Sequence, residues 1–536
     1  MKYISRRNFL AAALISIAAL WAKRPAWLSP GIKGKIEGAS HSIGHKIREA
    51  VIFKSTSSEA IQVVIVGSGI AGLSAARELE KNGLSNYCIL ELESIPGGNS
   101  CSGENQHGKY PWAAHYVPFV NKESTDVKEL FEELGVIKGY NKDGLPEYEE
   151  SYVCAAPEER LFIHGRWQEG IIPTLGISET DKIQIAAFNA KMESLRDEQG
   201  SDGKFAFSIP LNLSSTDAKY LRLDQINMKT WLEQNNYTSP PLHWYVNYCC
   251  KDDYGAEMQD VSAWAGIHYF AGRRGDAANA HSNSVLTWPE GNGWIVKKII
   301  EKLKNKPRLG QLAINIKEES GKAQVTYLDR QTDAVKSISA DYVLYAAPRF
   351  TAAHIFENLR SARPEYLKSF QYSPWLVANL SIYGKLQGSE KGFAWDNVAY
   401  SSKSLGYVNS SHQILSAKNQ PSILTYYLPL SDMPAKDARQ FLIGRTHEEL
   451  CELVLKDLSS MHRDIRDKLI NMDFWLWGHG MIRPTPGFIW GEHRQAAQKP
   501  LGLTHFAHSD MSGISIFEEA QHHGIRAARE IIARIA

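Results

Sequence analysis

A short apolar run and a helical repeat predict the first regular elements of the chain. Residues 63–66 read Val-Val-Ile-Val, a continuous β-branched run of the kind that forms a buried parallel strand. Apolar residues then recur at helical spacing from Ala71 to Leu79, and Asn-Gly at 82–83 supplies a helix stop. A second apolar run of strand length, 87–90, follows. The order strand, helix, strand predicts a βαβ unit of a parallel sheet.

Strand and helix patterns return later in the chain, which indicates an α/β fold. Residues 376–383 alternate apolar and polar positions at strand length. Further predicted strands are 312–316, 323–328 and 340–348, and predicted helices are 179–198, 215–235, 433–470 and one that begins near Gly524.

The first thirty residues predict an export signal. Arg6 and Arg7 precede an apolar run, 9–22, and Lys23 and Arg24 follow it. These 14 residues would span roughly 21 Å as a helix, which is less than the roughly 30 Å of a membrane core. The paired arginines resemble a twin-arginine signal, read by the twin-arginine translocase. The alternative is an ordinary amphipathic N-terminus with two surface arginines.

That pathway moves folded proteins, so the signal implies loading of any cofactor before export. We expect a periplasmic or otherwise exported protein, held at a membrane surface if the signal is retained. Residues 31–59 are weakly patterned and rich in small polar residues, so a linker with one short helix is expected there.

Composition excludes several classes of protein. The chain has 536 residues, enough for two to four domains, and its net charge of +1 argues against nucleic-acid binding. The hydrophobic share of 43% and the charged share of 22% exclude a disordered chain. Six cysteines without paired spacing exclude a disulfide scaffold and a zinc site, so no metal is expected. Adjacent Cys249 and Cys250 are either two thiols or a strained disulfide.

A glycine-rich loop follows the first predicted strand. Gly67 allows a tight turn, Gly69 lets the backbone approach a pyrophosphate, and Gly72 lets helix and strand pack closely. Glu91 lies 19 residues after Gly72, where a carboxylate can accept the ribose hydroxyls. A βα turn without a ligand is the alternative. The predicted dinucleotide loop consists of Gly67, Ser68, Gly69, Ile70, Ala71 and Gly72.

The residues after Glu91 resemble the flavin amine oxidase superfamily, which includes monoamine and polyamine oxidases, protoporphyrinogen oxidase and carotenoid desaturases. In that family a Gly-Gly pair follows the ribose carboxylate and wraps the pyrophosphate, and Gly97 and Gly98 match it. The family's next residue is usually Arg, whereas this chain has Asn99. The segment around His115 resembles the next flavin contact. The resemblance implies FAD as the cofactor.

The C-terminal part resembles the family's closing motif. Asp510 matches the residue that bonds the ribityl chain or the pyrophosphate, although a helix N-cap is the alternative. Backbone N–H groups near Ile516 and Phe517 would face the pyrimidine end of the flavin, where a helix N-terminus favours negative charge. A residue near Ala313 would touch the adenine.

The resemblance implies a Rossmann-type FAD-binding domain interleaved with an α+β substrate domain. The expected division is a signal at 1–30, a linker at 31–59, FAD-binding segments at 60–120, 286–348 and 491–536, and substrate-binding segments at 121–285 and 349–490.

Three departures from the amine oxidases concern the active site. No Cys stands near 483–488, where some members bond flavin covalently, so the FAD is expected to be non-covalent. The strand lysine of amine oxidases aligns with Asn379, and an aromatic of the amine cage aligns with Ile516. These departures bring amine oxidation into question and leave FAD binding intact.

We therefore expect an exported FAD-dependent oxidoreductase that passes a hydride from a small amine or amino-acid-like substrate to flavin N5, with O₂ or another acceptor. Candidate catalytic residues are His115, Asn379 and His479. Many of the 14 Trp residues fall in the expected substrate domain, which favours an aromatic-walled pocket there. Two alternatives stay open: a desaturase or isomerase that acts on a lipophilic substrate, and a non-catalytic FAD-binding partner protein.

Overall fold

The apolar run at 63–66 lies inside a seven-stranded sheet. The computed structural model describes residues 31–48, 58–281, 284–389, 393–414 and 421–535; the predicted signal at 1–30 lies outside these ranges. The predicted βαβ unit is formed by β2 (Ser58–Val66), α3 (Ile70–Lys81) and β3 (Tyr87–Glu91). Val63 to Val66 are all buried, which explains why this strand carries no polar alternation.

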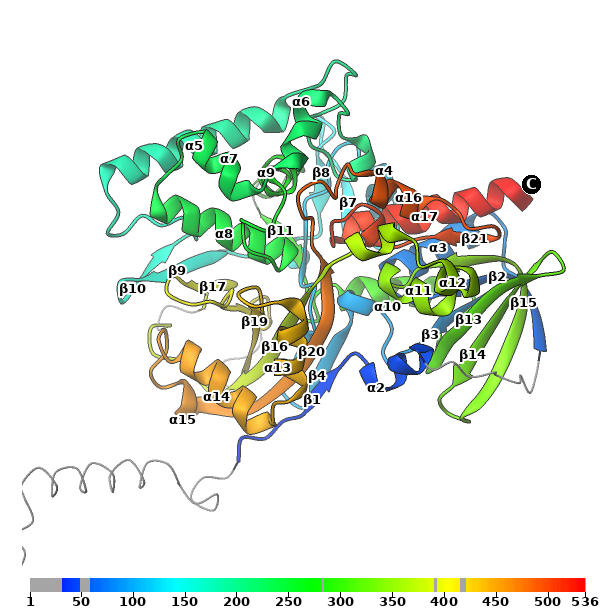
Figure 1. The fold of residues 1–536 in the computed structure, drawn as a ribbon. Coiled ribbons are helices and arrows are strands. Elements are labelled where there is room, and N and C mark those ends of the chain that lie inside the picture. The colour runs from blue at the N-terminus through cyan, green and yellow to red at the C-terminus, as the bar shows by residue number, and fades with distance from the viewer. Residues whose placement is uncertain (1–30, 49–57, 282–283, 390–392, 415–420, 536) are drawn as a thin grey trace, which may run out of the picture.

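This sheet has a parallel core, as a Rossmann-type fold requires. Strands β12 (Arg308–Leu309), β3, β2, β15 (Ala334–Tyr345) and β21 (Thr504–Phe506) run parallel in that order. An antiparallel hairpin of β13 (Gln311–Glu319) and β14 (Lys322–Asp329) extends it beside β15. The C-terminal helix α17 (Phe517–Ile535) packs on α3 against the sheet (Figure 1).

A second sheet has eight strands in the order β1-β20-β16-β19-β18-β17-β9-β10. Its central strand β16 (Tyr372–Ile382) covers the predicted strand 376–383 up to residue 382, but all eleven of its residues are buried. The polar positions Asn379 and Ser381 are 0% exposed, because β19 and β20 flank the strand and helices cover it. The other strands are β1 (Ile36–Gly38), β9 (Glu159–Ile163), β10 (Arg166–Glu169), β17 (Asp396–Ala399), β18 (Tyr407–Asn409), β19 (Ser422–Pro429) and β20 (Leu469–Ile482).

A helical lobe stands above the second sheet in Figure 1. The predicted helix 215–235 is divided there, because Asn227 ends an irregular stretch and caps a new helix by accepting a hydrogen bond from Thr230 N at 2.8 Å. The predicted range 433–470 is likewise divided. The helices of the lobe are α5 (Glu179–Asp197), α6 (Ala218–Leu221), α7 (Met228–Gln234), α8 (Pro240–Tyr254) and α9 (Ala263–Ala271). Those within 433–470 are α13 (Ala435–Ile443), α14 (His447–Leu458) and α15 (Ile465–Lys468).

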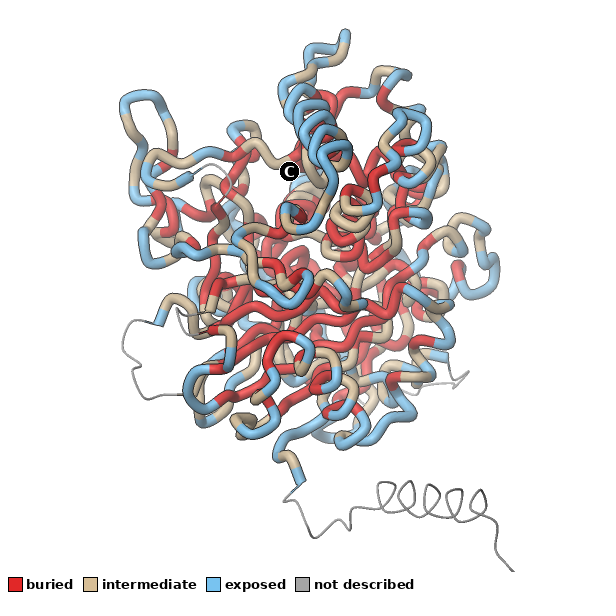
Figure 2. The backbone as a smooth tube through the Cα atoms, turned by 90° about the vertical axis from the view of Figure 1, so that its left-hand side faces the viewer, coloured by how far each residue is buried: buried red, intermediate tan, exposed pale blue. Residues whose placement is uncertain are grey.

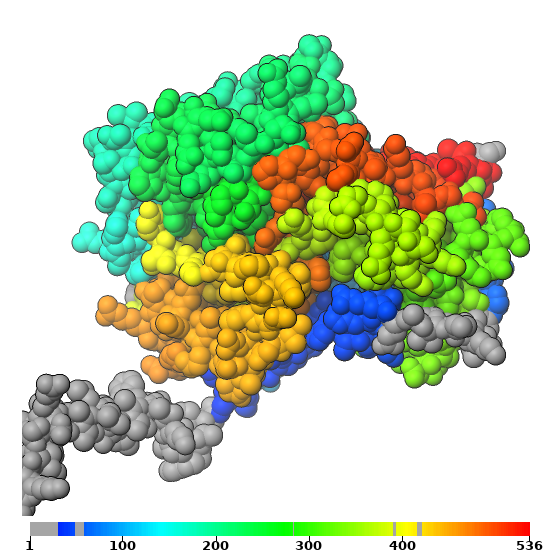
Figure 3. Space-filling model, in the orientation of Figure 1, coloured from blue at the N-terminus to red at the C-terminus, as the bar shows by residue number. Residues whose placement is uncertain are grey.

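Residues 31–48 are not a loose linker. Strand β1 adds to the edge of the second sheet beside β20, and helix α2 (His41–Gly44) continues toward the first sheet. Ser40 donates from its backbone N and its Oγ to the Glu93 carboxylate at 2.8 and 2.6 Å. Figure 3 shows this N-terminal segment (blue) on the surface, between the part of the protein that contains the second sheet and the part that contains the first. The arm, defined as residues 31–48, therefore ties the two sheets together.

The remaining elements connect these parts. They are β4 (Ser102–Asn105), β5 (Gly108–Pro111), β6 (Tyr116–Pro118), α4 (Thr125–Glu133), β7 (Ile137–Tyr140), β8 (Pro146–Tyr148), β11 (Val285–Thr287), α10 (Gly293–Lys302), α11 (Arg349–Ile355), α12 (Glu357–Ala362) and α16 (Glu492–Gln498), with short 3-10 turns between them.

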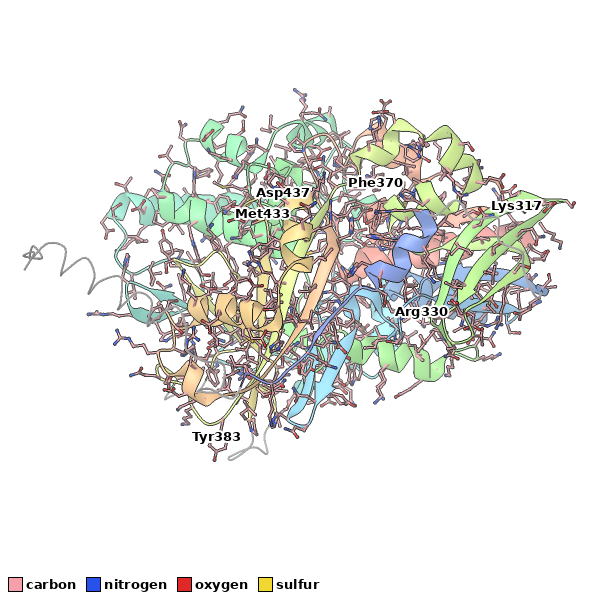
Figure 4. The ribbon with its side chains drawn as sticks, turned by 60° about the horizontal axis from the view of Figure 1, so that its bottom comes forward. Lys317, Arg330, Phe370, Tyr383, Met433 and Asp437 are labelled. Atoms are coloured by element: carbon pink, nitrogen blue, oxygen red, sulfur yellow. The ribbon has the colours of Figure 1, made fainter. Side chains whose placement is uncertain are left out.

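Burial follows the sheets. Figure 2 shows the strands as a largely buried layer, with exposed residues gathered in peripheral helices and loops. Tyr383, just after β16, is 65% exposed and points away from the protein in Figure 4. All six cysteines are buried and free, including Cys249 and Cys250. Within the described residues, none of the helices combines the length and apolar character needed to cross a membrane.

Candidate functional site

Two glycine turns meet at the carboxyl end of β2 and form a backbone cradle. Gly97 N donates to Ser68 O at 3.0 Å, and Gly69 and Gly97 form an isolated parallel bridge. Gly97 has φ of +117° and Gly98 has φ of +56°, conformations that favour glycine. The two turns predicted to contact a pyrophosphate therefore lie against each other.

The three loop glycines differ in their surroundings. A Cβ on Gly72 would lie 1.9 Å from Gly67 O, so this position is needed for close packing of helix and strand. A Cβ on Gly69 would meet nothing nearer than Gly97 O at 3.9 Å, so the space beside it is open. Gly69 is the N-cap of α3 and provides no side-chain cap, which leaves the first N–H groups of that helix available to an anion.

Glu91 ends β3 next to this cradle. Its Oε2 accepts hydrogen bonds from Ser68 N at 2.8 Å and Ser68 Oγ at 2.7 Å, and its Oε1 accepts one from Glu93 N at 2.8 Å. Burial raises the pKa of Glu91, and these hydrogen bonds oppose that shift. The open backbone beside Gly69, the uncapped helix and this fixed carboxylate fit the pyrophosphate and ribose of a dinucleotide.

The C-terminal residues approach from the other side of the first sheet. Asp510 is 1% exposed; its Oδ2 accepts a hydrogen bond from Arg349 N at 2.7 Å and another from the Tyr372 hydroxyl at 2.5 Å. Burial alone would raise the pKa of Asp510, but His508, 3.1 Å from Oδ1, and these hydrogen bonds lower it. The N-cap of its short turn is His508, so Asp510 is not a helix N-cap.

A chamber lies between the cradle, the second sheet and the start of α17. Its cavity volume is about 130 Å³, and its walls are mainly apolar and aromatic. The predicted residues Asn99, His115, Ile516 and Phe517 line it, although they come from opposite ends of the chain. Other lining residues include Ala113, Ala114, Tyr116, Asn292, Trp375, Val377, Leu405, Tyr427, Trp477, Gly480 and Met481.

One wall of the chamber, the segment 111–116, is held at each of its carbonyls by another part of the chain. Strands of the second sheet supply three of these hydrogen bonds, so the sheet fixes the position of the wall. The donors are Asn379 Nδ2 to Pro111 O at 3.1 Å, Trp477 Nε1 to Trp112 O at 2.9 Å, Tyr427 Oη to Ala113 O at 2.8 Å, Asn292 N to Ala114 O at 3.0 Å, Thr287 Oγ1 to His115 O at 2.8 Å and Asn292 Nδ2 to Tyr116 O at 3.2 Å.

The structure separates the three catalytic candidates. His115 lines the chamber and stacks on Tyr427 with ring centroids 4.7 Å apart. Asn379 lies outside the chamber and is fully committed, because it donates to Pro111 O and accepts from Thr425 Oγ1 at 2.6 Å. His479 also lies outside, stacked on Phe350 at 4.2 Å. Asn379 therefore supports the wall, and Val377, two residues earlier on its strand, reaches the chamber.

His115 is neutral at ordinary pH, because burial lowers its pKa to about 4. Its Nδ1 lies 3.2 Å from Ala113 O, which assigns the ring proton to Nδ1 and leaves Nε2 as a hydrogen-bond acceptor. Burial also lowers the pKa of His479 to about 4.

Asn99 and Ala313 make contacts within the protein itself. The Asn99 side chain donates from Nδ2 to Gly480 O, which joins the second glycine turn to β20. Ala313 lies at a bulge of β13 and belongs to the same buried cluster as Val66 and Leu90. Ile70 and Ala71, in the first turn of α3, are also buried.

The sequence motifs do not predict four charged residues of the chamber: Asp252, Asp253, Arg273 and Glu518. Burial raises the pKa values of Asp252 and Glu518 to about 7. The available signal is the Asp252-Asp253 pair, which follows the aromatic stretch 242–250 and Lys251; adjacent acids at a helix end usually face solvent, so a pair next to such an apolar stretch is unusual. In the part of the chain that the structure describes, no group of three His, Cys, Asp or Glu could hold a metal.

Comparisons with known proteins agree with this geometry. A family model described as flavin containing amine oxidoreductase matches residues 70–532. The chain is 24% identical over 494 residues to a probable flavin-containing monoamine oxidase A of Dictyostelium discoideum, a match that covers 88% of this chain and 97% of that protein. It is 25% identical over 275 residues to an L-amino acid dehydrogenase of Synechocystis sp., covering 50% of this chain and 53% of that protein.

The fold has solved counterparts. A putrescine oxidase redesigned in its cofactor binding superposes with a TM-score of 0.65 at 16% identity, covering 89% of this chain and 100% of that one. At this identity the likeness concerns the arrangement of the two sheets and the helical lobe.

Proposed function

Because the chain belongs to the flavin containing amine oxidoreductase family and is an FAD-dependent oxidoreductase, we propose that it oxidises a small amine or amino-acid-like substrate in the chamber. The names of its relatives, an L-amino acid dehydrogenase and a monoamine oxidase, support a substrate with an amino group. The acceptor is O₂ or another oxidant.

The residues of the cradle fit FAD. The turns at 67–72 and 97–98 and the N-terminus of α3 would hold the pyrophosphate, and Glu91 the ribose. When bound, FAD supplies a two-electron acceptor that takes a hydride at N5. None of the six cysteines is among the residues lining the chamber in the described chain, which supports non-covalent binding.

The chain's own contribution is to position the substrate in a dry, charged chamber. The aromatic walls exclude water, and the carboxylates of Asp252 and Glu518 can bind an ammonium group. His115 offers a neutral Nε2 acceptor to an N–H of the substrate. The N-terminus of α17 at Phe517 favours negative charge at the place where the closing motif would bring the flavin.

One observation carries this proposal: residues of the FAD motifs from both ends of the chain line the same chamber as two carboxylates without a cationic partner of their own. Such a lining disfavours the alternative lipophilic substrate, because an apolar ligand would leave buried acids unpaired.

The test is anaerobic reduction of the purified, FAD-loaded protein. Amines and amino acids are added singly, and we expect at least one class to bleach the flavin absorbance and, with O₂, to release peroxide. Lack of bleaching by every amine, together with bleaching by a polyene or porphyrinogen, would overturn the proposal in favour of the lipophilic alternative.

Export through the twin-arginine pathway is the second part of the proposal. It rests on the signal at Arg6-Arg7 and on the absence of disulfides among the six cysteines, all of which lie in the described ranges. An exported protein that needs no oxidising compartment can fold and load FAD before translocation.

A further inference from the structure

The arm, residues 31–48, holds the residue that orients the carboxylate assigned to the FAD ribose. Ser40 donates from its backbone N and its Oγ to the Glu93 carboxylate at 2.8 and 2.6 Å. The backbone N of Glu93 in turn donates to Glu91 Oε1 at 2.8 Å. The Glu91 carboxylate is therefore fixed from two sides, by Ser68 of the glycine loop and by the segment to which the arm is bound.

A second set of hydrogen bonds fastens the arm at the same place. Arg330, labelled in Figure 4, donates from Nη1 to Leu92 O at 3.1 Å and to Ser40 Oγ at 3.4 Å. Gly310 N donates to Glu93 O at 3.2 Å. Residues 92 and 93 are therefore held between the arm and the base of the β13–β14 hairpin.

The arm also covers an apolar surface beside this segment. Ile43 and Ile47 pack in one cluster with Leu92 and with the buried strand residues Leu312 and Ile314. Removing such aliphatic side chains from water stabilises the docked position of the arm. Hydrogen bonds and apolar contacts thus fix the arm at one site on the first sheet.

The covered surface lies at the adenosine end of the FAD site. Glu91 ends β3 at the carboxyl edge of the parallel strands, where dinucleotides bind in such folds, yet the residue is only 8% exposed. Ile47 also packs against the cluster that contains Ala313, the residue assigned to the adenine by the family resemblance. The arm therefore contacts the surroundings of both residues that would meet the adenosine.

The far end of the arm reaches the second FAD motif. The 3-10 turn η1 (His45–Arg48) packs on α11, and the first residue of α11, Arg349, donates its backbone N to Asp510. The arm thus extends from the ribose carboxylate on one side of the cofactor site to the helix that contacts Asp510 on the other.

This end of the arm also carries positive charge. Burial lowers the pKa of His479 to about 4, and Arg439 and Arg48 are the nearest cations that contribute to that shift. His479 in turn lies beside Tyr372, with ring centroids 5.8 Å apart, and Tyr372 donates to Asp510. Positive charge near the second motif favours a diphosphate held between the two motifs.

We propose that the arm is the outer wall of the FAD site at its adenosine end, and that it must be displaced to admit or release the cofactor. Ser40 is a positioning residue in this wall, because it acts on the ribose carboxylate through Glu93. The inference concerns the cofactor and is independent of the substrate that the chamber oxidises. An arm that only braced the two sheets would affect the stability of the protein and not the rate of FAD release.

The first test measures opening of the arm in the unaltered protein. Hydrogen exchange of residues 36–48 is compared in the FAD-free protein, with FAD, and with FMN, which lacks the adenosine part. We expect FAD to slow exchange of the arm at least about fivefold, and FMN to slow it less than about twofold. Equal exchange with and without FAD, or equal slowing by FMN, would overturn the inference.

Variants of the arm then relate its opening to FAD release. Ile43→Ala combined with Ile47→Ala removes apolar contacts, and it should raise the exchange rate of the arm and the release rate of FAD by the same factor, at least about tenfold. Ser40→Ala should raise both rates about 3- to 10-fold, and Ser40→Thr, which keeps the hydroxyl, should restore slow release. Ile183→Ala, at an exposed position on α5, is the control and should leave both rates unaltered.

Release of FAD from the loaded protein is followed by flavin fluorescence after dilution, and the Tm of each FAD-free variant is measured separately. Faster exchange of the arm without faster FAD release would show that the arm is only a brace between the sheets, which contradicts the inference. If a variant does not fold, the comparison of FAD with FMN in the unaltered protein still decides.

Discussion

Gly69 and Gly72 stand three residues apart, but a methyl group would have different consequences at each. At Gly72 it would lie 1.9 Å from Gly67 O, whereas at Gly69 its nearest neighbour would be Gly97 O at 3.9 Å. Gly69 also has φ of −67°, which alanine adopts without strain. Packing of the protein therefore requires glycine at 72 but not at 69, and we attribute the glycine at 69 to the approach of a ligand.

We predict that Gly69→Ala folds normally without cofactor but binds FAD at least about tenfold more weakly, because its methyl group enters the space where the pyrophosphate approaches. The measurements are the Tm of the FAD-free protein and the FAD dissociation constant. Gly72→Ala is the comparison, and it should lower the Tm itself. Unchanged FAD affinity in Gly69→Ala would mean that the pyrophosphate does not pass this residue.

The chamber carboxylates predict the pH dependence of cation binding. Burial raises the pKa values of Asp252 and Glu518 to about 7, so below that pH each is mostly protonated, and a bound cation must displace a proton. The charged or titratable neighbours are Asp253, Arg273, Tyr116, Glu159 and Asp396, while His115, with a pKa of about 4, stays neutral.

An alkylguanidine, which is charged throughout this range, should therefore bind about tenfold more weakly at pH 6 than at pH 8. Calorimetry in buffers of different ionisation enthalpy should show net proton release at pH 6. Asp252→Asn should reduce both effects. A flat affinity between pH 6 and pH 8 would show that these carboxylates are already ionised or do not face the ligand.

Helices α3 and α17 show how the two ends of the chain are joined at the level of elements. A Cβ on Gly524 would lie 2.1 Å from Ala71 O, so the backbones of the two helices touch at this point. The contact places the start of α17, and with it Phe517 and Glu518, relative to the glycine loop that begins α3.

We predict that Gly524→Ala destabilises the protein by about 1–3 kcal/mol, because the methyl group forces the two helices apart. Alanine favours a helix interior over glycine by up to about 1 kcal/mol, so a net loss identifies packing as the cause. Urea unfolding measures the change. Gly139→Ala, where a Cβ meets nothing within 4 Å, is the control, and an equal effect there would contradict the packing explanation.

The elements that the sequence predicts well are those whose pattern is local. The run at 63–66 and the loop at 67–72 are recognisable because strand, turn and helix follow one another within a few residues. The arm at 31–48 is not, since β1 has three residues and gains its stability from pairing with β20, more than 400 residues away. Long-range pairing leaves little trace in a single sequence.

The same distinction applies to the site. His115, Ile516 and Phe517 could be predicted because they belong to motifs, and all three line the chamber. The resemblance places Asn379 at the position of the strand lysine, but in the structure the Asn379 side chain donates to Pro111 O. Val377, two residues earlier on the same strand, lines the chamber. Asp252 belongs to no motif. Its place in the chamber depends on the fold, which brings the end of α8 and the start of α17 to the same cavity.

At the scale of the whole molecule, the arm and the cysteines bear on the proposed export. The arm is anchored to both sheets, through β20 and through Glu93, directly after the predicted signal. All six cysteines are free thiols inside the protein, so folding needs no oxidising environment. Both features suit the proposed export route, in which the chain would complete its fold, with FAD in place, before translocation.

We therefore predict that Arg6→Lys combined with Arg7→Lys keeps the protein in the cytoplasm in a folded, flavin-bound form, because the translocase reads the arginine pair and charge alone does not replace it. Fractionation with measurement of flavin fluorescence in each compartment tests this. Lys2→Gln, a charge change outside the pair, is the control and should be exported normally. Export of the double variant at the unaltered level would contradict the proposed pathway, and retained protein without flavin would contradict loading before translocation.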